Sequence, residues 1–530
     1  MKYFGWVFLF FTVVYLLPLA SRPLCAPDEF QCAATAHEMV VSGKYLLPVE
    51  SVAPVAGKSQ MPLGHWVVSA GIKLFGANSF SVRFPMAIAA GLMALFIWIL
   101  VKQSTGDEKL AALASTILLC CGAVYLGGTS ALPENIGAML AVGGSGCMFM
   151  GFQEKNFNRR KILLIILAGA FAAGAFAAGG LPQVLIMFLP QLVYAILEKR
   201  WKDVPFMLLP AFVIAALIVL PWAKKCGMDG EMFWKFFAEI GRDGEVYPWY
   251  TVFAVVFAGT FPVALLIPAA CFVGRDAWPK LIRQALYRHA LVFVAVTILL
   301  ALLPGMREPR WLIAGFAPMS VLIAAGVREY FNSGGHHRSY NWIMSLWGGA
   351  LILCGLALVT FAFFPSLLPD VGVVRTLPVS EFFCPVIGFV SICSGGFMLY
   401  SLTGNWRGRL YLFFFGLGLL PLCCNWLIVD NASMPEAWYK EVEKEFDTDS
   451  DHTVIYTSCA GKYVTAWSMR ECKTVSFKDK SAMIAALKSP DRKFAAAVVL
   501  SLDEAEGMPA AEKVFATGKL KAFYYPANSK

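Results

Sequence analysis

Long apolar runs alternate with short polar segments along most of the chain. Several runs approach the 20 or so residues that a helix needs to cross a bilayer, and together they predict about thirteen spans. The predicted spans lie near residues 3–20, 83–102, 110–128, 134–152, 162–180, 182–197, 205–222, 249–273, 289–304, 310–327, 342–365, 382–403 and 409–428. The neighbouring runs 162–180 and 182–197 fit either a helical hairpin or one broken helix.

The composition agrees with an integral membrane protein. Of the 530 residues, 58% are hydrophobic and only 15% are charged, whereas a soluble domain carries about 25% charged residues. The net charge of +9 is divided among short clusters between the apolar runs, so it does not indicate a nucleic-acid partner. Pro23, Leu24 and Cys25 make a poor signal-peptidase site, so we interpret the first run as a retained span.

Lysine and arginine in the short loops predict the orientation, because they concentrate on the cytoplasmic side. With the N-terminus inside, the basic loops all face the cytoplasm, namely 153–161, 198–203, 274–289, 327–340 and 404–409. The loops that then face outward are 21–82, 129–133, 223–248, 305–309 and 366–381. An odd number of spans places the C-terminal residues outside as well.

The last hundred or so residues are mixed polar, unlike the rest of the chain. Two strands and a helix are expected at 453–457, 494–501 and 479–489. We therefore expect two domains. Residues 1–428 would form an all-α polytopic membrane module with outer-face loop helices at 21–82, and residues 429–530 would form a small extracytoplasmic α/β domain.

The first outward loop opens with the adjacent acids Asp28 and Glu29. Pro27 fits the first position of a helix, and apolar residues from Phe30 to Val40 follow helical spacing, which predicts an amphipathic helix on the membrane surface. A second such helix is expected over 61–76. The two acids either favour the start of the helix through its dipole or supply a general base, and the pattern alone leaves both readings open.

Other outward loops also carry charge. Glu134 is the acid of a very short link between two spans, and Arg242, Arg307 and Arg310 lie in later outward loops. A guanidinium fork suits a phosphate, although an ion pair or contact with lipid headgroups would also explain these arginines. The spans are nearly free of charge, which favours chemistry at the membrane surface over the alternative of a transporter or flippase.

Two segments of the first loop carry a family pattern, "PDEFQCAATAHEMVVSGKYLLP" (27–48) and "QMPLGHWVVSAGIKLFGANSFSVRFP" (60–85). In order and length they resemble the first outer loop of the aminoarabinose transferase and protein O-mannosyltransferase superfamily. That loop has an Asp-Glu pair, a helix, a K-P-P-L-G-Y-W element and a closing R-l-P. The later segments "EIGR" (239–242), "YPWYTVF" (247–253) and "REPRWLIAGFAP" (307–318) follow in the family's order.

The resemblance implies a GT-C fold glycosyltransferase of a bacterial inner membrane. It would move a sugar from a polyprenyl-phosphate donor to a lipid, glycan or protein acceptor on the extracytoplasmic face. Asp28 would be the catalytic carboxylate, with Glu29 and Glu134 as further catalytic acids. The donor phosphate would meet Lys58, Arg242, Arg307 and Arg310, and the substrate pocket would include Gln60, His65, Tyr247, Trp249 and Trp311.

The resemblance has departures and leaves the cofactor open. Gln60 stands where the family has a lysine, and "AGGLP" (178–182) stands where it has K-G-P. The protein is therefore expected to be either a transferase, which could use another donor, or an inactive glycolipid-binding relative. No cofactor is predicted. A divalent metal stays open, although the sequence shows no ligand cluster and only the scattered histidines His37, His65 and His289.

Overall fold

The computed structural model describes most of the chain. The described residues are 2–20, 24, 27–46, 62–154, 156–226, 247–261, 263–265, 278–279, 281–303, 306–307, 309–332, 338–363, some positions between 388 and 399, 435–446, 453–458, 462–470, 472–477, 480–489, 494–505, 508–517 and 520–526. Two packing units divide the chain. One comprises Met1–Ser21, Met61–Gly64 and Arg83–Ile428, and the other Arg22–Gln60, His65–Val82 and Val429–Lys530.

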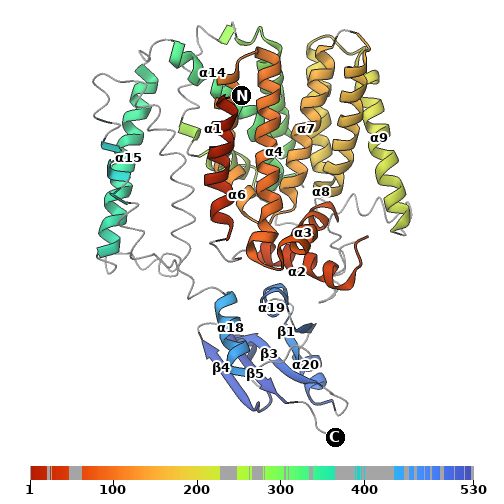
Figure 1. The fold of residues 1–530 in the computed structure, drawn as a ribbon, viewed down its shortest axis with the longest axis vertical. Coiled ribbons are helices and arrows are strands. Elements are labelled where there is room, and N and C mark those ends of the chain that lie inside the picture. The colour runs from red at the N-terminus through yellow and green to blue at the C-terminus, as the bar shows by residue number, and fades with distance from the viewer. Residues whose placement is uncertain are drawn as a thin grey trace. The chain divides into compact units, whose positions relative to one another are not determined.

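The first unit is a bundle of apolar helices, of which α1, α4, α7, α8 and α9 run roughly alongside one another (Figure 1). Its helices are α1 (Lys2–Phe11), α4 (Ser79–Thr105), α5 (Glu108–Cys120), α6 (Gly122–Thr129), α7 (Glu134–Gln153), α8 (Arg159–Leu197), α9 (Val204–Lys225), α11 (Thr251–Thr260), α13 (Ala285–Ala301), α14 (Ile313–Asn332) and α15 (Arg338–Phe363). A π turn (Thr12–Leu16) and a 3-10 turn (Leu17–Ala20) continue α1, and two further 3-10 turns are η3 (Val263–Leu265) and η4 (Pro309–Leu312).

The bundle confirms a polytopic membrane protein. The described part of the chain contains six helices long and apolar enough to cross a bilayer, or seven if the pair α5 and α6, bent by 67° at Cys121, is one span. The spans expected over 382–403 and 409–428 lie mostly or wholly outside the described residues. The count of about thirteen spans therefore stays a prediction.

Helix α8 is a hairpin, because both of its ends lie at the C-terminal end of α7. Near its start, Lys161 Nζ donates to the carbonyl of Glu154 (3.3 Å), and near its end Gln153 Nε2 donates to the hydroxyl of Tyr194 (3.3 Å). A straight helix would separate Lys161 from Tyr194 by about 50 Å. The chain reverses at Gly180, whose φ of 69° and ψ of −159° suit only glycine. Of the two readings of residues 162–197, the hairpin is the one observed.

The second unit contains two helices of the first loop, α2 (Pro27–Ser42) and most of α3 (Pro62–Phe75). Both helices were expected from the sequence, and α2 begins at Pro27 with its two acids in the first turn. It ends before Gly43, whose φ of 69° is typical of a helix C-terminus. The Ser69 hydroxyl of α3 donates to the Ala36 carbonyl of α2 (3.0 Å). The buried apolar residues of α2 include Phe30, Cys32, Ala33, Ala34, Ala36 and Met39.

The C-terminal residues form a mixed sheet with order β2-β1-β3-β5-β4, in which β2, β1 and β3 are parallel and β5 and β4 antiparallel. The elements are α18 (Pro435–Phe446), β1 (Thr453–Ser458), α19 (Lys462–Ser468), β2 (Lys473–Phe477), α20 (Lys480–Leu487), β3 (Ala495–Ser501), α21 (Leu502–Ala505), β4 (Lys513–Thr517) and β5 (Leu520–Tyr525). The two strands and the helix expected from the sequence are confirmed.

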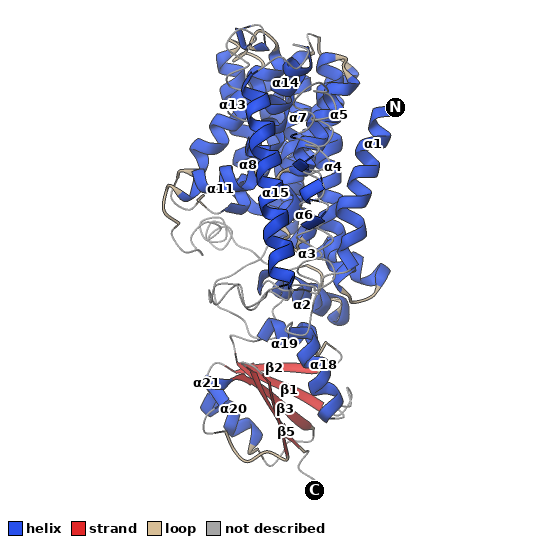
Figure 2. Ribbon diagram, turned by 90° about the vertical axis from the view of Figure 1, so that its left-hand side faces the viewer, coloured by secondary structure: helices blue, strands red, loops and turns tan. Residues whose placement is uncertain are grey.

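Helices cover both faces of this sheet (Figure 2). The alternation along β3 explains why, since Ala497 and Val499 join one apolar cluster while Ala496 and Val498 join the other. Helix α18 and the end of α19 pack on the first face, and α20 and α21 pack on the second. A sheet buried on both faces requires continuous apolar strands, which is the pattern of residues 495–500.

Candidate active site

A carboxylate and an arginine meet at the start of α7. Glu134 is the first residue of that helix, where the helix dipole favours a negative charge. Arg310 Nη1 lies 2.5 Å from Glu134 Oε1, and the two side chains are 35% and 17% exposed. The other carboxylate oxygen, Oε2, is buried and has no hydrogen-bond partner among the described residues. The carboxylate is thus held by one oxygen and offers the other to a ligand.

The loop before α7 is fixed by a close contact with the start of α3. A Cβ on Gly64 would lie 2.3 Å from the Cβ of Pro133, so only glycine lets the two segments approach this closely. Gly64 belongs to the P-L-G segment that the sequence comparison singled out. Its role in this unit is to hold the residue directly before Glu134, and hence the start of the helix that carries the carboxylate.

Arg307 lies three residues before Arg310 and is held by backbone carbonyls. Its Nε donates to the carbonyl of Leu302 (3.2 Å) and its Nη1 to the carbonyl of Tyr247 (3.3 Å). No carboxylate among the described residues forms an ion pair with it. Carbonyls orient a guanidinium without neutralising its charge, and the group has five N–H donors. Arg307 therefore keeps the capacity to bind an anion.

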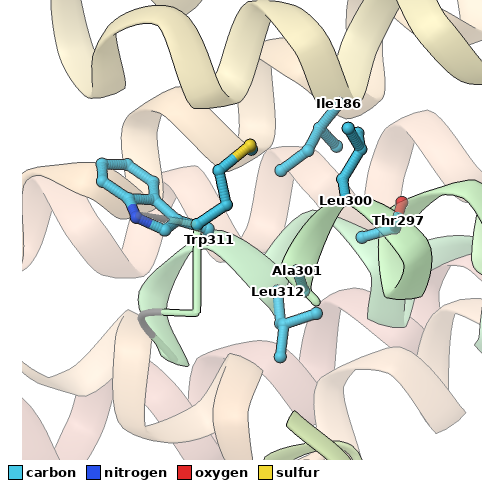
Figure 3. Close-up of a pocket in the computed structure, with 7 residues that line it drawn as sticks. Ile186, Thr297, Leu300, Ala301, Trp311 and Leu312 are labelled. Atoms are coloured by element: carbon cyan, nitrogen blue, oxygen red, sulfur yellow. The ribbon is translucent and has the colours of Figure 1, made fainter. Parts of the chain in front are cut away.

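A small apolar pocket lies beside the arginines (Figure 3). It is lined by Ile186, Thr297, Leu300, Ala301, Met306, Trp311 and Leu312, from α8, α13, η4 and the segment between them. Two polar atoms on its lining residues, the Thr297 hydroxyl and the Trp311 indole N–H, are buried and have no hydrogen-bond partner in the described part of the chain. The Arg310 guanidinium lies 5.7 Å from the centre of the Trp311 ring. The pocket thus joins an apolar wall to a cation.

Gln183 is a residue that the sequence reasoning missed. It is fully buried, and neither atom of its amide has a hydrogen-bond partner among the described residues. Its Cγ lies where Cβ atoms on Gly137 and Gly179 would clash, at 3.1 and 2.5 Å, so two glycines make room for it. The signal was present in the sequence, because a glutamine inside an apolar span is rare and is often functional or a contact between helices.

A second buried polar group lies deeper in the same bundle. Gln191 Nε2 lies 2.7 Å from His289 Nε2 and also bonds to the hydroxyl of Ser145. The His289 ring packs on Phe149, with ring centres 4.4 Å apart. These contacts join α7, α8 and α13, and they explain His289 as a residue that holds helices together.

The two acids of α2 have opposite environments. Asp28 is exposed, whereas Glu29 is 1% exposed. Successive helical positions differ by about 100° in direction, so adjacent residues of a half-buried helix often divide in this way. The Asp28 carboxylate is accessible to a substrate, and the Glu29 carboxylate lies within the protein.

The remaining predicted residues divide into two groups. Lys58, Gln60 and Arg242 lie outside the described residues. His65 is 3% exposed on α3, and Trp249 is 59% exposed at the start of α11. Neither residue lines the apolar pocket. The structure therefore brings together Glu134, Arg310 and Trp311, with Arg307 and the half-buried Tyr247 in contact through a backbone carbonyl.

Within the described residues no cluster of three or more His, Cys, Asp or Glu side chains could hold a metal ion.

Sequence comparison finds similarity to sugar transferases that use lipid-linked donors. Residues 59–224 match the family model described as dolichyl-phosphate-mannose-protein mannosyltransferase. The chain is 26% identical over 352 residues to an undecaprenyl phosphate-alpha-4-amino-4-deoxy-L-arabinose arabinosyl transferase of Enterobacter sp. (strain 638), covering 65% of this chain and 62% of that protein. A protein of the same description from Yersinia pestis (strain Pestoides F) is 23% identical over 494 residues, or 91% of this chain and 87% of that one.

Solved structures give the fold. The crystal structure of ArnT from Cupriavidus metallidurans bound to undecaprenyl phosphate has a TM-score of 0.78 at 16% identity, over 98% of both chains. The archaeal oligosaccharyltransferase AglB from Archaeoglobus fulgidus has a TM-score of 0.52 at 12% identity, over 94% of this chain and 69% of that one. In sequence the chain is thus similar to the aminoarabinose transferases and to the protein mannosyltransferase family model, and in fold it is similar to the ArnT structure.

Proposed function

We propose that the protein transfers a sugar from a polyprenyl-phosphate donor to a lipid, glycan or protein acceptor. The arabinosyl transferases that it resembles are described by their undecaprenyl phosphate-linked donor, and the similar ArnT structure holds undecaprenyl phosphate. The reaction would take place on the extracytoplasmic face of a bacterial inner membrane.

The observation that carries the proposal is the Glu134–Arg310 pair beside the apolar pocket. A polyprenyl-phosphate sugar combines an apolar chain, an anionic phosphate and a polar sugar, and a site for it must offer all three surfaces. The apolar side chains around Trp311 offer an apolar surface, and Arg310 and Arg307 offer cations. Glu134 Oε2, which has no hydrogen-bond partner among the residues that the structure describes, offers an acceptor for a sugar hydroxyl or amino group.

The chemistry of an inverting sugar transfer suggests a catalytic role for Asp28, Arg307 and Arg310. A hydroxyl of the acceptor attacks the anomeric carbon, the bond from that carbon to the phosphate oxygen breaks, and the polyprenyl phosphate leaves. Asp28 accepts the hydroxyl proton, which an exposed carboxylate can do. The guanidinium groups of Arg307 and Arg310 stabilise the negative charge that develops on the leaving phosphate. Lys58 and Arg242 are further candidates for the same phosphate.

The proposal includes the number of membrane spans and their orientation. About thirteen spans, an inside N-terminus and an extracytoplasmic C-terminal domain follow from the basic loops. The domain boundary is proposed near residues 428 and 429. His65, Gln60, Tyr247, Trp249 and Trp311 remain proposed as pocket residues, with Trp311 supported by its place in the apolar pocket.

The test is consumption of a labelled donor. Membranes that contain the protein are given polyprenyl-phosphate sugars carrying a labelled sugar, and transfer of label to extractable lipid, glycan or protein is measured. Arg310→Gln and Glu134→Gln at matched protein levels should both reduce transfer. Movement of intact labelled donor across vesicle membranes without transfer would instead indicate a flippase. Binding of the donor without turnover would indicate an inactive relative.

A further inference from the structure

The helix that carries Asp28 is packed against the C-terminal domain. Within this unit, α19 lies along α2. Trp467 of α19 is fully buried, although its helix has only seven residues. Its ring lies edge-on to the His37 ring of α2, at 6.3 Å between centres and 90° between planes. A tryptophan buried against a histidine of a distant segment is the main anchor of a contact between two elements.

The anchor is supported by Arg470, two residues after the end of α19. Its guanidinium lies 5.0 Å from the centre of the Trp467 ring, and its Nη1 donates to the Trp467 carbonyl (3.1 Å). Together these contacts define the tryptophan anchor, which consists of His37, Trp467 and Arg470. The hydrogen bond to the Trp467 carbonyl keeps the Arg470 guanidinium beside the indole ring, where the cation stabilises the position of the ring.

Helix α19 is itself fixed to the sheet, so the anchor is not a mobile loop. The Thr465 hydroxyl lies 2.7 Å from the hydroxyl of Tyr439 on α18 and 3.3 Å from that of Thr457 on β1. All three hydroxyls are buried, and burial raises the pKa of Tyr439 to about 12. A satisfied buried network of this kind specifies one arrangement of its elements. Any movement of the sheet is therefore transmitted to Trp467.

On the other side, α2 is held by the bond from Ser69 to the carbonyl of Ala36. The carbonyl belongs to the residue directly before His37, so the helix is held at the same turn by α3 and by α19. Asp28 lies nine positions before His37 on a continuous helix, about 13 Å along the axis. Because α2 is one continuous helix that is held at this turn, its first turn, which carries Asp28, is held in place with it.

We infer that the C-terminal domain is a positioning device for the catalytic carboxylate, because it docks on α2 through the tryptophan anchor and thereby fixes the place of Asp28. The inference rests on the proposed function in one respect, since Asp28 is the base of that reaction. Trp467 and His37 are positioning residues and touch no substrate in this scheme. Misplacing a reacting group by about 1 Å can cost about 10²-fold in rate, so loss of the anchor should lower turnover strongly.

The anchor is also expected to respond to pH. Burial lowers the pKa of His37, the positive charge of Arg470 lowers it further, and Glu38 on the same helix opposes the shift. These are the charged groups that act on His37 among the described residues. Because the folded state disfavours the proton, docking is fully stable above the ordinary histidine pKa of about 6.5 and weakens as the pH falls towards the lowered value. Protonation would place a second cation beside Arg470.

The experiment uses the full-length protein in detergent and measures two quantities, hydrogen exchange of residues 27–42 and turnover of a polyprenyl-phosphate sugar. Trp467→Ala should increase exchange in α2 and lower kcat by about 10²-fold, with a much smaller change in donor KM. Trp467→Phe keeps an aromatic ring and should restore most of both. Met483→Ala is the matched control, because Met483 is buried under the opposite face of the sheet. It should leave exchange in α2 unchanged.

The outcomes separate the two claims. Unchanged exchange in α2 of Trp467→Ala would overturn the docking, whatever the turnover. Increased exchange with wild-type kcat would overturn the positioning role. A wild-type protein that turns over no polyprenyl-phosphate sugar, while Trp467→Ala still loosens α2, would remove the proposed function and leave the docking established. When kcat is measured against pH, the wild-type protein should lose kcat as the pH falls below about 6.5, and His37→Asn should abolish this loss. An unchanged profile would refute the role of His37.

Discussion

Adjacent residues can serve different purposes when a helix lies half in and half out of the protein. Asp28 and Glu29 illustrate this, because one is exposed and the other is 1% exposed. A buried carboxylate contributes to structure through the groups that satisfy it, whereas an exposed one is free to exchange protons with a substrate. Pairs of acids in a sequence motif therefore need not share a catalytic role.

The role of Asp28 predicts the effect of one substitution. Asp28→Asn should leave expression and membrane insertion normal, because asparagine is also tolerated at the start of a helix and dipole effects amount to about 0.3–1 kcal/mol. Turnover should fall by about 10²–10⁴-fold, since the amide cannot accept a proton. Labelled sugar transfer at equal protein levels measures the effect. Glu38→Gln on the same helix is the control and should stay near wild type.

Near-normal sugar transfer by Asp28→Asn would show that Asp28 only stabilises the start of α2 and is not the base. In that case Glu134 would become the leading candidate for the base, because its second oxygen has no partner among the described residues.

The Glu134–Arg310 pair predicts a coupled response. Arg310→Gln should raise the donor KM by about 10- to 100-fold, because a hydrogen bond to a charged group is worth about 1.5–3 kcal/mol. Arg310→Lys keeps the charge and loses the planar fork, so its effect should be smaller. The double variant Glu134→Gln/Arg310→Gln should be less impaired than the product of the single effects. Independent effects would show that the two side chains do not act together.

At the scale of elements, the reversal in α8 depends on one glycine. Gly180→Ala places a Cβ at a φ of 69°, which costs about 1–2 kcal/mol or more. The purified protein should therefore lose thermal stability. Gly146→Ala on α7 is the matched control, because its new Cβ would meet only Leu100, at 4.0 Å. Alanine is the better helix former, so that variant should be neutral or slightly stabilised. Equal melting temperatures would contradict the hairpin.

The same elements show what a sequence can and cannot predict. The length of the apolar runs located the helices, and a short continuous apolar run located β3, because both patterns depend on local burial. Periodicity could not decide between a hairpin and a broken helix in α8, since the direction of the chain after Gly180 depends on one backbone angle. Periodicity also showed that α2 has an apolar face. It could not show that α19, which lies far away in the sequence, covers part of that helix. Gln183 stands out in the sequence as a polar residue inside an apolar span, but its burial could not be predicted, because the space for it depends on Gly137 and Gly179 from other turns.

At the scale of the whole molecule, the orientation predicted from the basic loops can be checked directly. A reporter that is active only outside the cytoplasm, fused after Lys530, should be active, and a reporter active only in the cytoplasm should not. The matched control is the same pair of reporters inserted in the basic loop at 198–203, where the outcomes should be reversed. A cytoplasmic result after Lys530 would mean an even number of spans.

The contact between His37 and Trp467 has a consequence for biosynthesis. A ribosome makes α2 several hundred residues before it makes α19. At about 5–20 residues per second, translation alone leaves the early helix without this partner for tens of seconds. The part of its surface that α19 covers, beside His37, must be shielded during that interval by lipid, by the insertion machinery or by a chaperone. Quality control of the nascent protein would then sense whether α19 has been made.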